Sequence, residues 1–175
     1  KQNINLKDSS DEIMRNLLTS QQPLIDQIYI LQDKFGEKFI NAATDITGYG
    51  FIGHLKEMID SSNLIRKNKK LEPIKVLLDL LAFKAYPGVF DLIKKGIQSS
   101  LFESNKEILD QILSEKRNKR IIIFSENNKL DQESFKEKIS LLLDPQTCGP
   151  LLISCNPKYE RFLKDEWYKV GEVIN

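Results

Sequence analysis

The feature that most constrains this chain is the segment of residues 43–54, which reads A-T-D-I-T-G-Y-G-F-I-G-H. An apolar run precedes it, and apolar residues at helical spacing follow it. Gly48 and Gly50 permit backbone angles that other residues adopt only at a cost, so a sharp turn fits between them. The segment therefore predicts a strand, a tight turn and the start of a helix, with Asp45 at the end of the strand.

Asp45 stands where a strand-end carboxylate can hold a metal ion. Mg²⁺ prefers carboxylate oxygens, and the N–H groups at the start of the next helix can meet phosphate oxygens. Thr44 and Thr47 add hydroxyl groups, and Gly48 leaves room for a phosphate to approach. As an alternative, the carboxylate only caps the helix. The G-x-x-x-x-G-K-[ST] phosphate-binding loop is absent, as is the dinucleotide fingerprint.

Helical and strand patterns mix along the whole chain. Apolar spacing predicts helices over 13–18, 24–31, 52–59, 87–96, 105–112, 135–142 and 157–167, and strands over 39–44, 74–78, 120–124, 151–155 and 168–174. We expect residues 61–63 to end the third helix, Asn105 to cap the fifth, and the strand over 120–124 to be buried on both faces. The pattern predicts an α/β fold (α+β type), a mixed β-sheet covered by helices, with residues 1–175 as one domain.

Composition excludes several classes of protein. The 175 residues carry a formal net charge of +1, which implies no general attraction to nucleic acid or to a membrane surface. No apolar run reaches the length of about 18 residues that a membrane span needs, and the amino terminus has no apolar signal core. The two cysteines lack the spacing of a metal site, so we expect a reduced, cytoplasmic setting.

The cysteines and the one histidine carry weaker expectations. Cys148 has no basic neighbour in sequence, which argues against a catalytic thiol, and Cys155 is expected in the core. Because His54 is the one histidine of the sequence, a His–His metal site is excluded and a hydrolytic triad is disfavoured. We expect His54 to pack or hydrogen-bond locally, or to brace the glycine turn.

Residues 144–149, which read D-P-Q-T-C-G, form a second turn directly before the strand over 151–155. Asp-Pro typically starts a turn. The N–H groups of Thr147, Cys148 and Gly149 could form an anion-binding nest. A plain turn between helix and strand is the alternative.

Several motifs together resemble those of the selenophosphate synthetases (selenide, water dikinases). Residues 43–54 resemble the family's T-D-V-T-G-F-G-L-L-G-H segment, and residues 87–105 its P-G…G-I-x-S-S-L…N stretch. Residues 143–149 resemble the L-D-P-Q-T-S-G-G-L-L turn, and residues 171–173 the closing G-x-V. The similarity covers nearly the whole chain. The combination separates this family from aminoimidazole ribonucleotide synthetases, thiamine-phosphate kinases and hydrogenase maturation factors, which share the superfamily fold.

The resemblance implies the carboxyl-terminal domain of a two-domain enzyme with the aminoimidazole ribonucleotide synthetase-like fold. Such enzymes, usually homodimers, make selenophosphate, AMP and phosphate from ATP, selenide and water. Their catalytic Cys or selenocysteine, catalytic Lys and most Mg²⁺ ligands belong to an amino-terminal ATP-binding domain, which this chain lacks and would need as its partner. On this chain the resemblance implies no catalytic residue. It implies Asp45 as a Mg²⁺ ligand, with Thr44, Thr47 and Gly48 as nucleotide-binding neighbours.

Two residues depart from the family's pattern: Cys148 stands where the family usually has Ser, and Pro150 where it has Gly. Proline has no N–H and a fixed φ, so the second turn loses a donor and becomes stiffer. This leaves two alternatives open. One is a non-catalytic scaffold or dimerisation domain, for example in a protein fused to a flavin- and nicotinamide-dependent oxidoreductase. The other is a sibling ATP-dependent enzyme with another acceptor.

Overall fold

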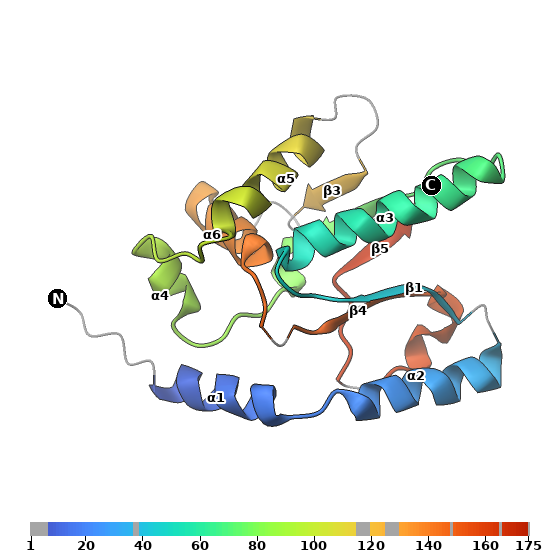
Figure 1. The fold of residues 1–175 in the computed structure, drawn as a ribbon, viewed down its shortest axis with the longest axis horizontal. Coiled ribbons are helices and arrows are strands. Elements are labelled where there is room, and N and C mark those ends of the chain that lie inside the picture. The colour runs from blue at the N-terminus through green and yellow to red at the C-terminus, as the bar shows by residue number, and fades with distance from the viewer. Residues whose placement is uncertain are drawn as a thin grey trace.

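The computed structural model describes residues 7–36, 39–114, 120–124, 130–147, 149–164 and 166–174 (Figure 1). Its α-helices are Lys7–Leu18 (α1), Gln22–Phe35 (α2), Gly50–Asn68 (α3), Val89–Lys94 (α4), Phe102–Ser114 (α5) and Gln132–Leu143 (α6). Its strands are Ile40–Asp45 (β1), Lys75–Asp79 (β2), Ile121–Phe124 (β3), Leu151–Cys155 (β4) and Gly171–Ile174 (β5). Short 3₁₀-helices span Leu80–Ala82 (η1) and Pro157–Phe162 (η3).

The described strands form two small sheets. In the first, β1 pairs with β4 in antiparallel fashion, and Asp45 lies opposite Leu151. In the second, the order is β3-β2-β5, with β2 parallel to β3 and antiparallel to β5. Parallel neighbours need a long crossover, and α4 and α5 lie within the crossover from β2 to β3.

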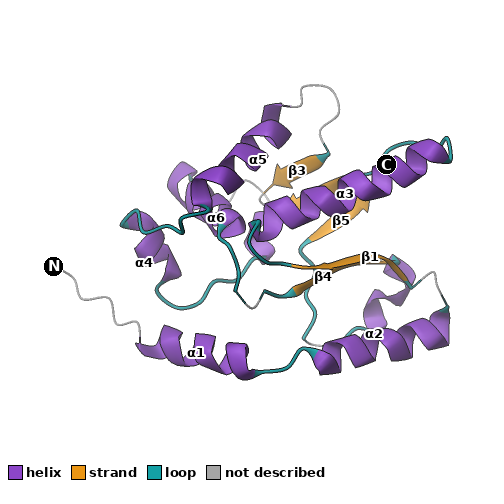
Figure 2. Ribbon diagram, in the orientation of Figure 1, coloured by secondary structure: helices purple, strands orange, loops and turns teal. Residues whose placement is uncertain are grey.

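The hydrophobic core lies where α3, α5 and α6 cover the second sheet (Figure 2). One face of α3 contributes Ile52, Leu55 and Ile59, which recur at the spacing of a helix face. Their partners in the core come from the other elements, and those that are most buried are Leu78, Leu80, Ile112, Leu142 and Leu143. This packing fixes the first turn of α3 against the end of α6.

The two amino-terminal helices run along the opposite side of the first sheet (Figure 1). An aromatic cluster attaches the end of α2 to η3: the Phe35 ring lies 4.6 Å from the ring centroids of both Tyr159 and Phe162. The buried Phe39, directly before β1, joins this cluster. None of the helices in the described part of the chain is both long and apolar enough to cross a membrane.

The expected fold class is confirmed, since helices and two sheets, of which the three-stranded one is mixed, make up an α/β fold. The strand order corrects one expectation: β3 is an edge strand, and only Ile121 among its residues is buried. A continuous β-branched run predicts burial but does not say which strand is central. That residues 1–175 form one domain remains a prediction.

Some helix boundaries differ from the expected ones for reasons of tertiary structure. Helix α3 continues past residues 61–63 to Asn68, because Asn63 exchanges two hydrogen bonds with the backbone of Ile74 instead of ending the helix. Asn105 does not cap α5, which begins at Phe102. The helix expected over 157–167 is η3, which ends at residue 162.

Candidate functional site: the glycine turn and Asp45

Asp45 is the last residue of β1 and is exposed. Side chains alternate along a strand, and the residues of β1 alternate between half-buried and exposed, with Asp45 on the exposed side. Its carboxylate makes no hydrogen bond or ion pair with any residue that the structure describes. Next to it, Ile46 is buried. The acid is therefore held in place by its backbone while its charge faces solvent.

The turn after Asp45 requires glycine at position 50. Gly50 has a φ of +62°, in the left-handed region. A Cβ atom on Gly50 would also lie 2.8 Å from the Leu143 carbonyl oxygen and 2.9 Å from that of Leu142. The missing side chain thus makes room for the end of α6. Because Gly50, Ile52 and Gly53 are all buried, the start of α3 lies inside the protein, whereas the Asp45 side chain before the turn is exposed.

The second turn packs directly against the first. The Ile46 N–H donates to the Pro150 carbonyl oxygen at 3.0 Å, and the Gln146 N–H donates to the Thr47 carbonyl oxygen at 3.1 Å. A Cβ atom on Gly149 would lie only 1.5 Å from the Ile46 carbonyl oxygen, so no side chain fits there. Residues 146, 149 and 150, which belong to a separate motif in the sequence, therefore pack against the glycine turn.

The motif of residues 87–105 also contacts the glycine turn, through the side chain of Asn105. This residue lies inside α5, is 3% exposed, and donates its amide N–H groups to the carbonyl oxygens of Gly48 at 3.0 Å and Leu143 at 2.9 Å. The sequence pattern predicted only a capping role for Asn105, and this contact was missed. A signal was available, because Asn is a poor residue inside a helix.

His54 hydrogen-bonds within the glycine turn, as one of the two expectations had it. Its Nε2 lies 3.0 Å from the Thr47 hydroxyl, and its Nδ1 lies 3.3 Å from a carboxylate oxygen of Glu57. In the tautomer with Nδ1–H donating to Glu57, Nε2 accepts a hydrogen bond from the Thr47 hydroxyl. The histidine is buried and stabilises the turn from inside.

The other residues predicted to bind the nucleotide beside Asp45 form hydrogen bonds within the chain. The Thr44 hydroxyl donates to the Asp45 carbonyl oxygen at 3.1 Å, and Thr44 alternates with Asp45 along the strand. The Thr47 hydroxyl contacts His54, and the Gly48 carbonyl accepts from Asn105. A role of Thr44, Thr47 and Gly48 in nucleotide binding remains a prediction.

The two residues that depart from the family's pattern, Cys148 and Pro150, and the second cysteine, Cys155, are each placed differently. Cys148 lies outside the described residues. Pro150 contributes its carbonyl oxygen to the pairing of β1 with β4, so the missing N–H leaves that bond intact. Cys155 is half-buried rather than fully in the core, and burial raises the pKa of its thiol, which makes it a poor nucleophile.

Asp45 is the residue of this corner that the sequence predicts as a ligand of a divalent cation. Among the described residues no three His, Cys, Asp or Glu side chains gather as a metal site would need. Mg²⁺ is often bound by one or two carboxylates, with water and substrate phosphates completing its octahedron. The unpartnered Asp45 fits such a shared site as a single ligand. The described residues do not supply the further side chains that a metal site built by this chain alone would need.

Comparisons with curated proteins find relatives that are named selenide, water dikinase. The relative from Photobacterium profundum is 31% identical over 129 residues, which is 74% of this chain and 29% of the relative. The relative from Shigella flexneri is 28% identical over 170 aligned positions, 90% of this chain and 41% of the relative. That from Escherichia coli (strain K12) is 28% identical over 153, with 85% and 36% covered. The chain spans less than half the length of these relatives, and no family model matches it.

Proposed function

This chain is homologous to the selenide, water dikinases, and on that premise we propose that it is the carboxyl-terminal domain of a selenophosphate synthetase. The full-length protein, meaning this chain with an amino-terminal ATP-binding domain, would make selenophosphate, AMP and phosphate from ATP, selenide and water. It would be a cytoplasmic homodimer. The chain alone would be inactive, because the catalytic residues would belong to the amino-terminal domain.

The observation that carries this proposal is the state of Asp45. Its carboxylate is exposed and unpaired among the described residues, yet its backbone is fixed by β4 and by the buried Ile46. A rigid strand end positions a ligand better than a loop does. An acid with no cationic partner in the described part of the chain is available for a cation supplied with a substrate.

In this function Asp45 would hold Mg²⁺ together with carboxylates of the amino-terminal domain and the phosphates of ATP. Bound there, Mg²⁺ would neutralise the charge that develops during phosphoryl transfer. The carboxylate oxygens of Asp45 would be the metal ligands. The hydrogen bonds of Thr47 with His54 and of Gly48 with Asn105 would keep the adjoining backbone in place. Thr44, Thr47 and Gly48 are proposed as the nucleotide's neighbours on this side.

The test compares the wild-type full-length protein with Asp45→Asn, using phosphorus NMR to follow selenophosphate and AMP formed from ATP and selenide. We expect the variant to lose on the order of 10²-fold in rate, the usual cost of removing one electrostatic stabiliser of a transition state. Asp60→Asn is the matched control, since Asp60 is paired within the chain, and it should retain wild-type activity.

Three results would contradict the proposal. An Asp45→Asn variant as active as the wild type would remove the role given to Asp45. A wild-type full-length protein that consumes no ATP with selenide would favour the non-catalytic scaffold, and one that is active only with another nucleophile would favour the sibling enzyme.

A further inference from the structure

The glycine turn is tied to the end of α6 by one buried side chain, that of Asn105. We propose that Asn105 is a positioning residue for the metal–nucleotide site: it touches neither metal nor substrate but fixes the turn that carries Asp45. The inference rests on the proposed function, since the role of Asp45 is itself a proposal. It goes beyond that function by assigning a task to a residue on a different helix.

The geometry of Asn105 suits this task. Its one amide nitrogen donates to two carbonyl oxygens, Gly48 at 3.0 Å and Leu143 at 2.9 Å, which uses both of its N–H groups. The residue is 3% exposed, so solvent does not supply these bonds. The Leu143 carbonyl belongs to the last turn of α6, where the helix itself provides no donor. The amide thus satisfies a helix end and a turn at once.

These bonds complete a continuous set of restraints next to Asp45. The Ile46 N–H is bound by Pro150, the Thr47 carbonyl by Gln146 and the Gly48 carbonyl by Asn105. Three consecutive residues after the acid are therefore fixed. The first two restraints come from the second turn, and Asn105 holds the start of that turn through Leu143. Removing the amide would loosen the glycine turn and the second turn together, because it bonds to both.

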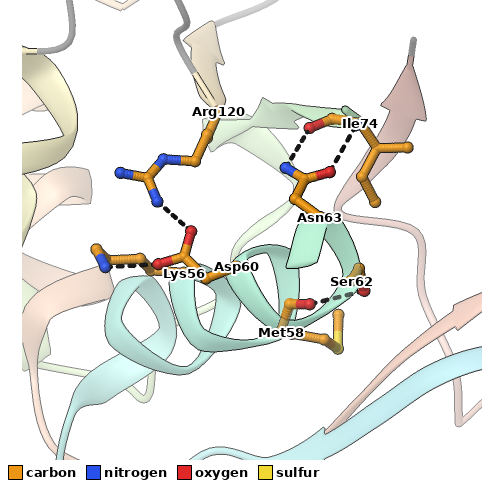
Figure 3. A network of polar contacts seen from close by, with 7 residues as sticks. All are labelled: Lys56, Met58, Asp60, Ser62, Asn63, Ile74 and Arg120. Carbon is orange, nitrogen blue, oxygen red and sulfur yellow. Dashed lines mark hydrogen bonds and ion pairs between the residues drawn. The ribbon is translucent and has the colours of Figure 1, made fainter. Parts of the chain in front are cut away.

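A matched control for Asn105 lies on α3. Asn63 is also an asparagine inside a helix whose side chain makes two hydrogen bonds to backbone, here with the N–H and the carbonyl oxygen of Ile74 (Figure 3). It lies in the carboxyl-terminal half of α3, away from the glycine turn at the start of this helix. Loss of either amide should destabilise the fold. Only loss of Asn105 should affect Asp45.

The experiment makes Asn105→Leu and Asn63→Leu in the full-length protein, because leucine keeps a similar volume and removes the donors. Hydrogen–deuterium exchange by mass spectrometry follows the peptide that covers residues 45–50, and activity is titrated against Mg²⁺. For Asn105→Leu we expect exchange in 45–50 to accelerate about tenfold or more and half-maximal activity to need about ten times more Mg²⁺, because catalytic geometry tolerates little displacement. For Asn63→Leu, both quantities should stay at the wild-type values.

Equal effects of the two variants on exchange in 45–50 and on the Mg²⁺ titration would overturn the inference and assign Asn105 a purely structural role. If Asn105→Leu does not fold, Asn105→Ala replaces it: its smaller side chain leaves space for a water molecule to meet both carbonyls, and smaller changes in the same direction are expected. Asp45→Asn distinguishes the two failures. If it leaves the Mg²⁺ titration unchanged, the proposed function and this inference both fail. If it raises the Mg²⁺ requirement while Asn105→Leu matches Asn63→Leu, only the inference fails.

Discussion

Two acids, one before α3 and one in its carboxyl-terminal half, show how differently this chain treats a carboxylate. Asp60, in the carboxyl-terminal half of the helix, pairs with Lys56 at 2.7 Å and with the Arg120 guanidinium (Figure 3). Asp45, just before the helix, is exposed and has no partner among the described residues. The Asp60 carboxylate thus stabilises the fold through its two cations, whereas the Asp45 carboxylate has no such partner among the described residues and, in the proposed function, binds an external cation.

The two regions are also held together by different forces. Around Asp45 the contacts are uncharged and mostly buried: backbone hydrogen bonds, the Asn105 amide and close packing at Gly50. Around Asp60 they are ion pairs whose side chains are 25–33% exposed. Salt screens the second kind far more than the first. The corner that carries Asp45 should therefore be the more rigid of the two and the less sensitive to ionic strength.

The largest effect is expected from Gly50→Ala, which should lower the free energy of unfolding by about 3 kcal/mol. Alanine at this position adopts a left-handed φ and places a Cβ against the carbonyls of Leu142 and Leu143. Gly96→Ala is the matched control, because Gly96 has a φ of +71° with nothing within 4 Å of a Cβ, and it should cost only about 1 kcal/mol. Urea unfolding measures both; equal losses would mean that the packing at Gly50 does not matter.

A smaller effect is expected from Asp60→Asn, which should lower the free energy of unfolding by about 1 kcal/mol, because it leaves Lys56 and Arg120 facing each other without the acid. Asp45→Asn should change stability by less than about 0.5 kcal/mol, as substitutions at unpartnered surface positions do. Urea unfolding at low and at high salt measures both variants. A loss for Asp45→Asn as large as that for Asp60→Asn would contradict the comparison.

The pH dependence gives a second check on Asp60. Partial burial alone would raise the pKa of this carboxyl, but the hydrogen bonds and charges of Lys56 and Arg120 outweigh it and hold the pKa below 3.8. The folded protein therefore binds the proton less tightly than the unfolded chain. The stability that Asp60 adds is present above pH 3.8 and is lost as the pH falls through the folded-state pKa. The gap between wild type and Asp60→Asn should close in that acidic range.

The smallest effect is expected from Asp144→Asn, and its sign is opposite. Burial of Asp144, at the end of α6, raises the pKa of its carboxyl above 3.8. The folded protein then binds the proton more tightly than the unfolded chain, so stability falls as the pH rises from 3.8 through the folded-state pKa. At pH 7 the variant should be more stable than the wild type by up to about 0.5 kcal/mol. Unfolding between about pH 3 and pH 7 measures this gain, and a gain that grows as the pH falls would contradict it.

Much of the local structure around the site could be predicted from the sequence. Glycines at 48 and 50, set between an apolar run and a helical pattern, marked the strand, the turn and α3, and Asp45 lies at the strand end where it was expected. The contacts of Asn105 could not be predicted from spacing, because its partners lie 57 and 38 residues away. Such contacts depend on how helices pack, which local patterns do not encode.

The same limit explains the wrong boundaries. Residues 61–63 resemble a helix end, since serine and asparagine compete with helical hydrogen bonds. In the folded chain Ser62 donates its hydroxyl to the Met58 carbonyl, and Asn63 bonds to Ile74, so the helix continues. The apolar run before residue 125 predicted a central strand, but the neighbours of a strand are set by topology, and β3 lies at an edge.

Gln21, the residue directly before α2, contacts the same corner, because its side-chain amide donates to the carbonyl oxygen of Gly149 at 2.7 Å. Gly149 in turn touches the backbone of Ile46, the neighbour of Asp45. A shift of the amino-terminal helices would thus be transmitted to the acid through two contacts. The backbone beside the carboxylate is thus linked to the residue that opens α2, and a domain that displaced this helix would act on Asp45 through the link without contacting it.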